Sequence, residues 1–171
     1  MSDVSIPMSL PLDSDGFLRR ECPKCERQFK WLHREAEPSS EIEAPAPEAY
    51  FCPYCHEPAP PDAWWTKEQL DYARALAMAE VVGPQLRRFQ RSLQSLNRPG
   101  GFLRVDVTPS ATPRPEALTE PDDMVRVDLP CHLEEPLKID EAWTAEVACL
   151  VCGIRYPAEL VRALPEADAE G

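Results

Sequence analysis

The spacing of hydrophobic and polar positions changes along the chain, and these changes predict its secondary structure. Apolar and polar residues alternate in residues 17–21 and 27–31, and again in 102–107 and 124–129, which predicts four short strands. Between the two pairs, residues 67–97 follow a helical period, with apolar residues every three or four positions. The pattern therefore predicts an α+β fold: two small β-rich units joined by one long α-helix.

The long helix has a clear start and an interruption. Thr66 followed by Lys67-Glu68-Gln69 is typical of a capping box. Gly83-Pro84 falls in the middle, where Pro84 cannot donate a hydrogen bond to the carbonyl of Glu80, so we expect a kink or a break. The apolar stripe of this helix either folds back onto the β units or forms the seam of a dimer. It consists of Tyr72, Leu76, Ala79, Val82, Leu86, Phe89, Leu93 and Leu96.

Two cysteine pairs lie in the first predicted unit, one at the tip of its hairpin and one after the loop that follows. Cys22-Pro23-Lys24-Cys25 is followed by Cys52-Pro53-Tyr54-Cys55, and two CxxC turns are what a tetrahedral Zn²⁺ site requires. This stretch resembles the zinc ribbon, in which each CxxC turn lies at the tip of a hairpin. The chain departs from the usual pattern by placing Glu26 and His56 after the second cysteines, where glycine often provides a positive φ. Rubredoxin, which holds iron with four cysteines, is the competing resemblance, and its compact core has little room for the Pro- and Glu-rich residues 35–49.

The second of these motifs also raises a redox hypothesis. The tetrapeptide Cys52-Pro53-Tyr54-Cys55 is identical to the active-site motif of glutaredoxins. A redox CxxC needs its first thiol at the N-terminus of a helix. Here three prolines follow within six residues, at 58, 60 and 61, and they prevent a helix from continuing. A dithiol oxidoreductase therefore remains an alternative to the zinc site.

The remaining three cysteines lie in the C-terminal half and predict a second zinc site. Cys131, Cys149 and Cys152 supply three ligands, and His132 is the nearest fourth. Neighbouring residues of an extended strand point to opposite faces, so Cys131 and His132 can bind together only if the chain turns at Pro130. Other possible fourth ligands are His33, His56, a carboxylate or water, and a bound water would make the site resemble that of a zinc hydrolase.

These motifs define the expected organisation of the chain. The segments are an N-terminal arm (1–12), a first ribbon (13–65) with a mobile loop (35–49), the helix (66–98), a second ribbon-like unit (99–157) with a Pro-rich linker (108–123), and an acidic tail (158–171).

The net charge of −12 disfavours a general nucleic-acid binder, but basic residues gather in residues 17–34 and 81–104. The chain has no signal-peptide pattern and no long apolar run, so a cytoplasmic location is expected. In that reducing compartment, cysteines are more often metal ligands than disulfides. Arginine is much commoner than lysine, which is typical of a GC-rich bacterial genome.

The sequence lacks a nucleophile elbow, a phosphate-binding loop and an HExxH helix. It therefore predicts a non-enzymatic zinc-binding adaptor or regulator, with no catalytic residues, that acts through a protein partner or self-association by residues 67–97. One alternative is a nucleic-acid-binding zinc ribbon that uses the two basic segments. The other is an enzyme, either a dithiol oxidoreductase at Cys52 and Cys55 or a zinc hydrolase at the second site.

Overall fold

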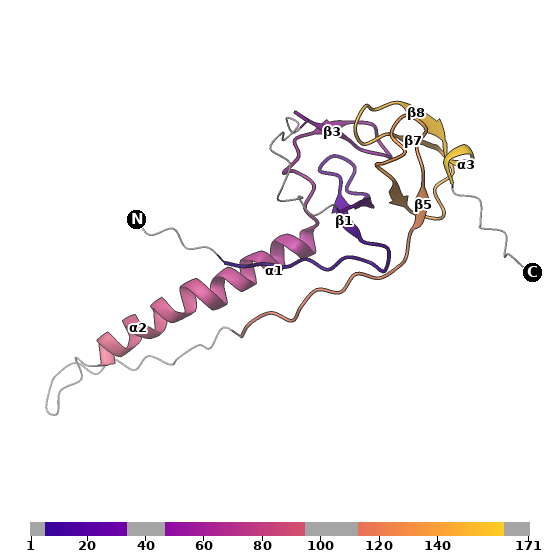
Figure 1. Cartoon of the computed structure of the whole chain (residues 1–171). Helices are drawn as coiled ribbons and strands as arrows, with labels where there is room; N and C mark the ends of the chain where they lie inside the picture. Colours follow the sequence, from indigo (N-terminus) through magenta and orange to yellow (C-terminus); the bar gives the residue numbers. More distant parts are fainter. Residues whose placement is uncertain (1–5, 34–46, 95–112, 163–171) are drawn as a thin grey trace, which may run out of the picture. The chain divides into compact units, whose positions relative to one another are not determined.

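The computed structural model describes residues 6–33, 47–94 and 113–162. These residues form small antiparallel sheets and one long helix, which is an α+β arrangement (Figure 1). They belong to two compact units: a sheet unit (Leu10–Lys67 and Thr119–Gly171) and a helical unit (Met1–Ser9 and Glu68–Leu118). The predicted strand at 102–107 and most of the predicted loop at 35–49 lie outside the described residues.

The sheet unit contains a four-stranded sheet in the order β1-β2-β6-β5. Its strands are β1 (Phe17–Glu21), β2 (Gln28–Leu32), β5 (Val125–Val127) and β6 (Leu137–Ile139). Strand β1 has its predicted bounds, and β2 and β5 occur within a few residues of theirs. The central pairing of β2 with β6 joins residues more than a hundred positions apart, for example Trp31 and Leu137. Both cysteine-rich halves thus lie in one compact unit, whereas the sequence suggested a separate unit on each side of the helix.

Two further hairpins and a short helix complete the sheet unit. The first hairpin pairs β3 (Tyr50–Phe51) with β4 (Pro58–Ala59), and the second pairs β7 (Glu146–Ala148) with β8 (Arg155–Pro157). Helix α3 (Ala158–Val161) follows β8 directly. The chain then returns to the main sheet, where Arg162, the residue after α3, forms a β-bridge with Val127. Residues 158–161 of the expected acidic tail are therefore ordered and packed.

The hydrophobic core lies on one face of the four-stranded sheet. Phe29 in β2 is completely buried, and its ring makes edge contacts with those of Trp31, Tyr54 and Trp64. The aliphatic residues Leu137, Ile139 and Val127 continue this face across β6 and β5. The alternation of apolar and polar residues in these strands agrees with this placement.

The opposite face of the sheet carries a row of basic side chains, one from each strand. Arg19, Lys30, Lys138 and Arg126 are successive cross-strand partners from β1 to β5. Lys30 is completely buried and Lys138 is 3% exposed. Like charges at facing positions destabilise a sheet, and buried charges are costly unless they are paired. The row therefore requires carboxylates close by.

Acidic residues from two segments cover this basic row. Residues 119–123, here called the acidic strap, place Glu120 at 3.0 Å from Lys30 Nζ and Asp122 at 2.8 Å from Lys138 Nζ. The turn before β1 adds Asp13, whose Oδ2 lies 2.9 Å from Lys138 Nζ and 3.2 Å from Lys30 Nζ. The part of the predicted Pro-rich linker that forms the strap is thus a structural element of the sheet unit.

Among the described residues, Asp13 is the one carboxylate that pairs with both buried lysines. Burial acts to raise its pKa, but backbone N–H groups of Phe17 and Asp15 and the two ammonium groups bind the ionised form. Together they lower the pKa of Asp13 to about 2. Asp13 is therefore ionised at neutral pH, where it compensates the charge of Lys30 and Lys138.

The helical unit contains one helix that changes its winding partway. Helix α1 (Lys67–Ala77) begins at the predicted residue, directly after Thr66. It continues through a π-helical turn, η1 (Met78–Val82), into α2 (Gly83–Gln94), as Figure 1 shows. The N–H of Gly83 binds the carbonyl of Met78 five residues earlier, so the wider turn accommodates Pro84 without ending the helix. The predicted last turn, residues 95–97, lies outside the described residues.

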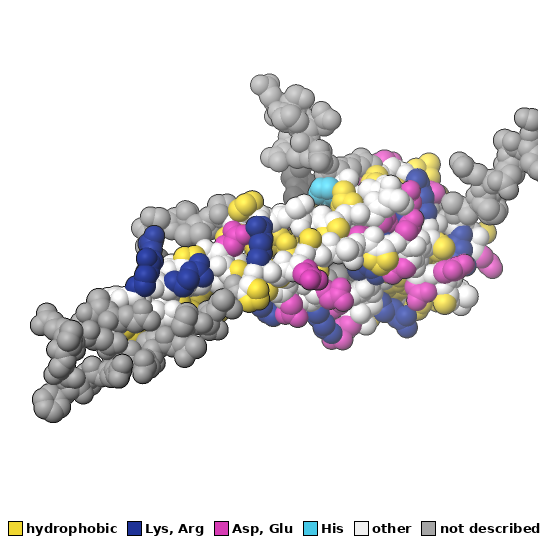
Figure 2. All heavy atoms as spheres, turned by 90° about the horizontal axis from the view of Figure 1, so that it is seen from below, with side chains coloured by type: hydrophobic (Ala, Val, Ile, Leu, Met, Phe, Trp, Pro, Cys, Tyr) yellow, Lys and Arg dark blue, Asp and Glu magenta, His cyan; other side chains and the backbone are white. Residues whose placement is uncertain are grey.

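Part of the apolar stripe of this helix is exposed. Leu76 is buried, whereas Leu86 is 47% exposed and Phe89 is 61% exposed. On the face shown in Figure 2, basic and hydrophobic side chains stand next to each other along the helix. Within the described residues, no helix has the length and apolar composition needed to cross a membrane.

The shared carboxylate of Asp13 gives a first prediction. Asp13→Asn should lower the free energy of unfolding by about 3 kcal/mol, because two buried ammonium groups lose one of their charged partners. Urea unfolding at neutral pH measures the change. Asp71→Asn is the control, because Asp71 pairs with Arg74 at the surface and both side chains are 74% exposed. Equal stability losses in the two variants would contradict a stabilising role of the buried ion pairs.

Candidate metal centres

Three CxxC turns of the chain share the same backbone hydrogen bonds, and we call each one a cysteine knuckle. In the first knuckle, the N–H of Cys22 binds the carbonyl of Arg27, and the N–H of Glu26 binds the carbonyl of Cys22, both at 3.0 Å. The corresponding bonds recur in the second knuckle, at Cys52, and in the third, at Cys149. Each knuckle thus holds its two cysteines on one side of a closed turn.

The residue after the second cysteine of each knuckle has a positive φ. The values are 57° at Glu26, 65° at His56 and 71° at Gly153. The absence of glycine from the first two knuckles therefore does not change their geometry. It does place two non-glycine residues in the left-handed region, where a Cβ costs about 1 kcal/mol or more.

The first and second knuckles bring four sulfur atoms together. The Sγ atoms of Cys22 and Cys55 are 3.7 Å apart, and those of Cys25 and Cys52 are 3.8 Å apart. All four lie within 4.8 Å of one another, and the four cysteines are free thiols rather than disulfides. This group, here called site 1, could hold a metal ion.

Site 2 is formed by the third knuckle and a turn in the opposite segment. Its potential ligands are Cys131, His132, Cys149 and Cys152, whose ligand atoms also lie within 4.8 Å of one another. The Nδ1 of His132 lies 3.4 Å from Cys149 Sγ, and Cys152 Sγ lies 3.5 Å from Cys131 Sγ. This group could also hold a metal ion.

A turn at Pro130 lets two neighbouring residues point into site 2. The N–H of His132 binds the carbonyl of Leu129 at 3.0 Å, so the chain reverses over Pro130 and Cys131. This is the turn that the sequence required for Cys131 and His132 to act together. The other two histidines are outside the group: His33 is exposed, and His56 is half-buried in the second knuckle.

Two features of the surroundings decide whether the sulfur atoms are thiols or thiolates. Burial strongly raises the pKa of Cys52 and raises that of Cys149 to about 12, so without a cation these thiols hold their protons. Backbone N–H groups nevertheless point at the sulfurs: that of Lys24 lies 3.3 Å from Cys22 Sγ, and that of Tyr54 lies 3.4 Å from Cys52 Sγ. Such donors stabilise thiolates once a metal has displaced the protons.

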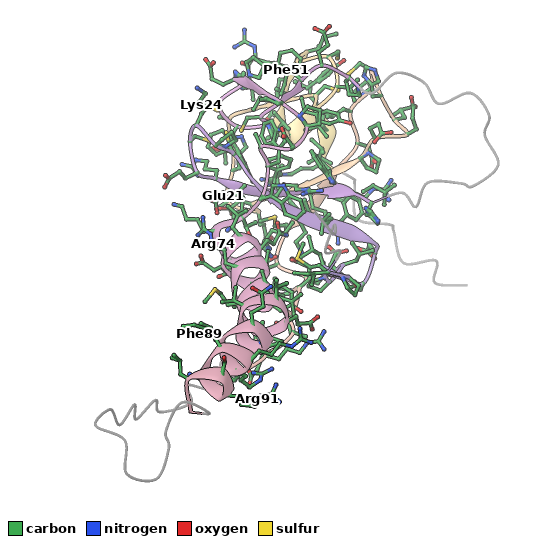
Figure 3. The ribbon with its side chains drawn as sticks, turned by 90° about the vertical axis from the view of Figure 1, so that its left-hand side faces the viewer. Glu21, Lys24, Phe51, Arg74, Phe89 and Arg91 are labelled. Carbon is green, nitrogen blue, oxygen red and sulfur yellow. The ribbon has the colours of Figure 1, made fainter. Side chains whose placement is uncertain are left out.

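The two sites are attached to each other through the second and third knuckles. The N–H of Phe51 binds the carbonyl of Leu150 at 2.8 Å, and the N–H of Ala148 binds the carbonyl of Pro53 at 3.0 Å. Phe51 also packs against Gly153, where an added Cβ would lie 3.0 Å from the Phe51 ring. Gly153 therefore provides both the positive φ and the room for this ring. Figure 3 labels Phe51 in this part of the molecule.

Several residues that support the sites were not singled out from the sequence. Tyr54 donates its hydroxyl to the carbonyl of Gln28 at 2.9 Å and accepts the N–H of Asp140 at 3.0 Å, which ties the second knuckle to the ends of β2 and β6. The sulfur of Cys131 raises the pKa of Tyr156. The place of Tyr54 inside a CxxC motif was a visible signal, whereas these hydrogen-bond partners depend on the tertiary fold.

No protein-family model, curated protein or solved structure matches this chain. Its function is therefore inferred from the two sites and their surroundings.

The contact between Gly153 and Phe51 gives a second prediction. Gly153→Ala should destabilise the protein more than Gly16→Ala does. Both glycines have a positive φ, but an added Cβ has nothing within 4 Å at Gly16 and meets the Phe51 ring at Gly153. Gly16→Ala should cost about 1 kcal/mol for the backbone alone. Thermal unfolding measures the two costs, and equal values would show that the ring does not constrain the third knuckle.

Proposed function

We propose that this chain is a non-enzymatic zinc-binding adaptor whose two structural zinc ions hold together a surface for protein–protein contacts. The observation that carries the metal assignment is the spacing of the ligand atoms. Four sulfurs around one Zn²⁺ at about 2.3 Å define a tetrahedron with edges of about 3.8 Å. The separations in site 1 are 3.7 and 3.8 Å.

The composition of the ligand sets supports structural zinc at both sites. Cys22, Cys25, Cys52 and Cys55 form a Cys₄ set, and Cys131, His132, Cys149 and Cys152 form a Cys₃His set. Both sets are typical of closed structural zinc sites, and neither leaves a coordination position for a reacting water. The knuckle geometry also supports the zinc-ribbon resemblance, with the second ribbon-like site attached to the first.

The enzymatic alternatives have less support. A redox CxxC needs an exposed, acidic first thiol, but Cys52 is completely buried and its pKa is raised. The chain after Cys55 continues into the short strand β4 and not into a helix. A zinc hydrolase would need an open position at site 2, which four protein ligands would fill.

Part of the basic surface that nucleic-acid binding would need is already paired with carboxylates. Arg19 and Lys30, two of the basic residues in segment 17–34, bind carboxylates of the acidic strap. The exposed arginines of α2, at positions 87, 88 and 91, remain available for a partner. A phosphate backbone would be repelled by the overall charge of −12.

The best candidate for a protein-binding surface is the exposed part of the helix. Leu86 and Phe89 leave much of their side chains in solvent, and Figure 3 labels Phe89 beside Arg91 on α2. A second copy of the helix in antiparallel orientation would place the α2 arginines opposite Glu68, Asp71 and Glu80, which are all exposed. We propose that the chain self-associates in this way, since burying a large apolar side chain contributes about 1.5–3 kcal/mol.

Metal content tests the zinc assignment. Cys52→Ser should lose one of two bound zinc ions and destabilise the sheet unit, because a structural zinc contributes on the order of 10 kcal/mol of binding energy.

His132→Ala should weaken zinc binding at site 2 and leave site 1 filled, because the two sites share no ligand. Atomic emission spectroscopy and competition with a chelator measure both effects. His33→Ala is the control and should keep both ions; full zinc content in Cys52→Ser would overturn the assignment.

Sedimentation tests the helix surface. The wild type should be a dimer at micromolar concentration, and Phe89→Asp should convert it to a folded monomer, because a carboxylate cannot be buried in an apolar seam. Leu160→Asp is the control, since Leu160 is 73% exposed on α3 and lies outside the helical unit. A monomeric wild type would overturn self-association, and if its Phe89→Asp variant also unfolds, the stripe belongs to the core of one chain.

A further inference from the structure

A cavity of about 450 Å³ lies beside site 2 in the sheet unit. Its walls come from β1, β2, β3, the turn at Cys131 and the third knuckle. The lining includes Arg20, Trp31, Tyr50, His132, Leu150 and Val151. The volume is in the range of small-molecule pockets, and the walls combine aromatic and aliphatic side chains with polar and charged ones.

Arg20 is the cationic side chain of this cavity, and its hydrogen-bonding capacity is unused. Its guanidinium lies 4.4 Å from the ring centre of Trp31 and 5.3 Å from that of Trp65. Its Nε is buried and has no hydrogen-bond partner. Within the part of the chain that the structure describes, Arg20 has no ion-pair partner either. A buried donor without a partner costs free energy, and a shift of the guanidinium towards a ligand that supplied an acceptor would recover it.

Arg20 keeps its charge although it forms no ion pair. Burial lowers its pKa to about 10, which still leaves the group a cation at neutral pH. The neighbouring Arg19 on the opposite face of β1 is bound to the carboxylates of Glu120 and Asp123. Two adjacent arginines therefore differ sharply: one is saturated by the acidic strap, and the other is open towards a cavity.

We propose that this cavity binds a carboxylate carried by an apolar or aromatic body, with Arg20 as its anchor. A guanidinium that rests against tryptophan rings presents its N–H groups along its edge, in the geometry that receives both oxygens of a carboxylate. Leu150, Val151 and Trp31 would contact the apolar body of the ligand.

The charges that line the cavity favour a singly charged anion over a doubly charged one. The carboxylate of Glu134 also lines it, and it repels a dianion more strongly than a monoanion. Phosphate, which is in large part a dianion at neutral pH, should therefore bind less tightly than a carboxylate. The proposal goes beyond the proposed function, because neither the identity of the metal nor association of the helices enters it.

Titration of the full-length, zinc-loaded protein with benzoate tests the proposal, with the Nε–Hε signal of Arg20 followed by NMR. We expect a saturable shift with a dissociation constant of about 1 mM or less, and weaker binding of phosphate at equal ionic strength.

Arg20→Gln should weaken benzoate binding about tenfold or more, because a charged hydrogen-bond donor is lost. Arg126→Gln is the control, since Arg126 is 51% exposed and binds Asp128. No saturation at about 50 mM benzoate would overturn the proposal.

A second pair of variants keeps the test independent of the folding of Arg20→Gln. Val151 occupies the third position of its CxxC motif, where the first knuckle carries the exposed Lys24, so a charged residue is compatible with the turn. Val151→Glu should weaken benzoate binding and Val151→Lys should not. Equal affinities of the two variants would contradict an electrostatically selected carboxylate.

The source of the carboxylate is distinguished by a parallel titration with N-acetyl-phenylalanine, which mimics a peptide C-terminus. Tighter binding than benzoate would identify a peptide terminus as the ligand, and tighter binding of benzoate would identify a free acid. If neither binds while both zinc ions are present, the carboxylate proposal fails and the zinc assignment stands.

Discussion

Seven cysteines and one histidine must be held as two sets of four in a unit whose strands are only two to five residues long. Strands of this length cannot align the ligands by themselves, so the backbone hydrogen bonds of the three knuckles and the turn at Pro130 do so. The bonds between Phe51 and Leu150 and between Pro53 and Ala148 then fix the two sets against each other. Under the zinc proposal, each ion closes a loop between distant segments and replaces part of the hydrophobic core that so small a unit lacks.

The two faces of the main sheet differ in the side chains that they bury. The core face is apolar and supports the second knuckle through Phe29 and Tyr54. The other face carries buried lysines, which are acceptable only because Asp13 and the acidic strap surround them. This arrangement ties the segment that follows the helical unit to the strands that precede it. Some of the clustered basic residues of the sequence therefore form ion pairs inside the molecule. Fewer of them remain to bind a nucleic acid.

Local features of the sequence predicted local features of the structure. The bounds of β1, the start of the helix after Thr66 and the pairing of cysteines within each CxxC turn all follow from residue type and spacing. The grouping of Cys131 and His132 with Cys149 and Cys152 followed from counting ligands, given a turn at Pro130.

The features that were missed depend on contacts between distant residues. Pairing of β2 with β6 leaves no local signal, because alternation gives the faces of a strand but not its neighbour. The burial of Lys30 could not be anticipated, since its partners Glu120 and Asp123 lie ninety positions away in a segment that looked like a linker. The π-helical turn before Pro84 is a further case, because a proline predicts a disturbance of the helix but not its form.

The central claim is that two closed zinc sites, one Cys₄ and one Cys₃His, organise the sheet unit. X-ray absorption at the zinc edge of the purified protein tests it most directly. The account predicts two zinc ions per chain and an average shell of sulfur at about 2.3 Å with a minor nitrogen contribution at about 2.0 Å. A shell dominated by oxygen or nitrogen, or one zinc ion per chain with three free thiols, would contradict it.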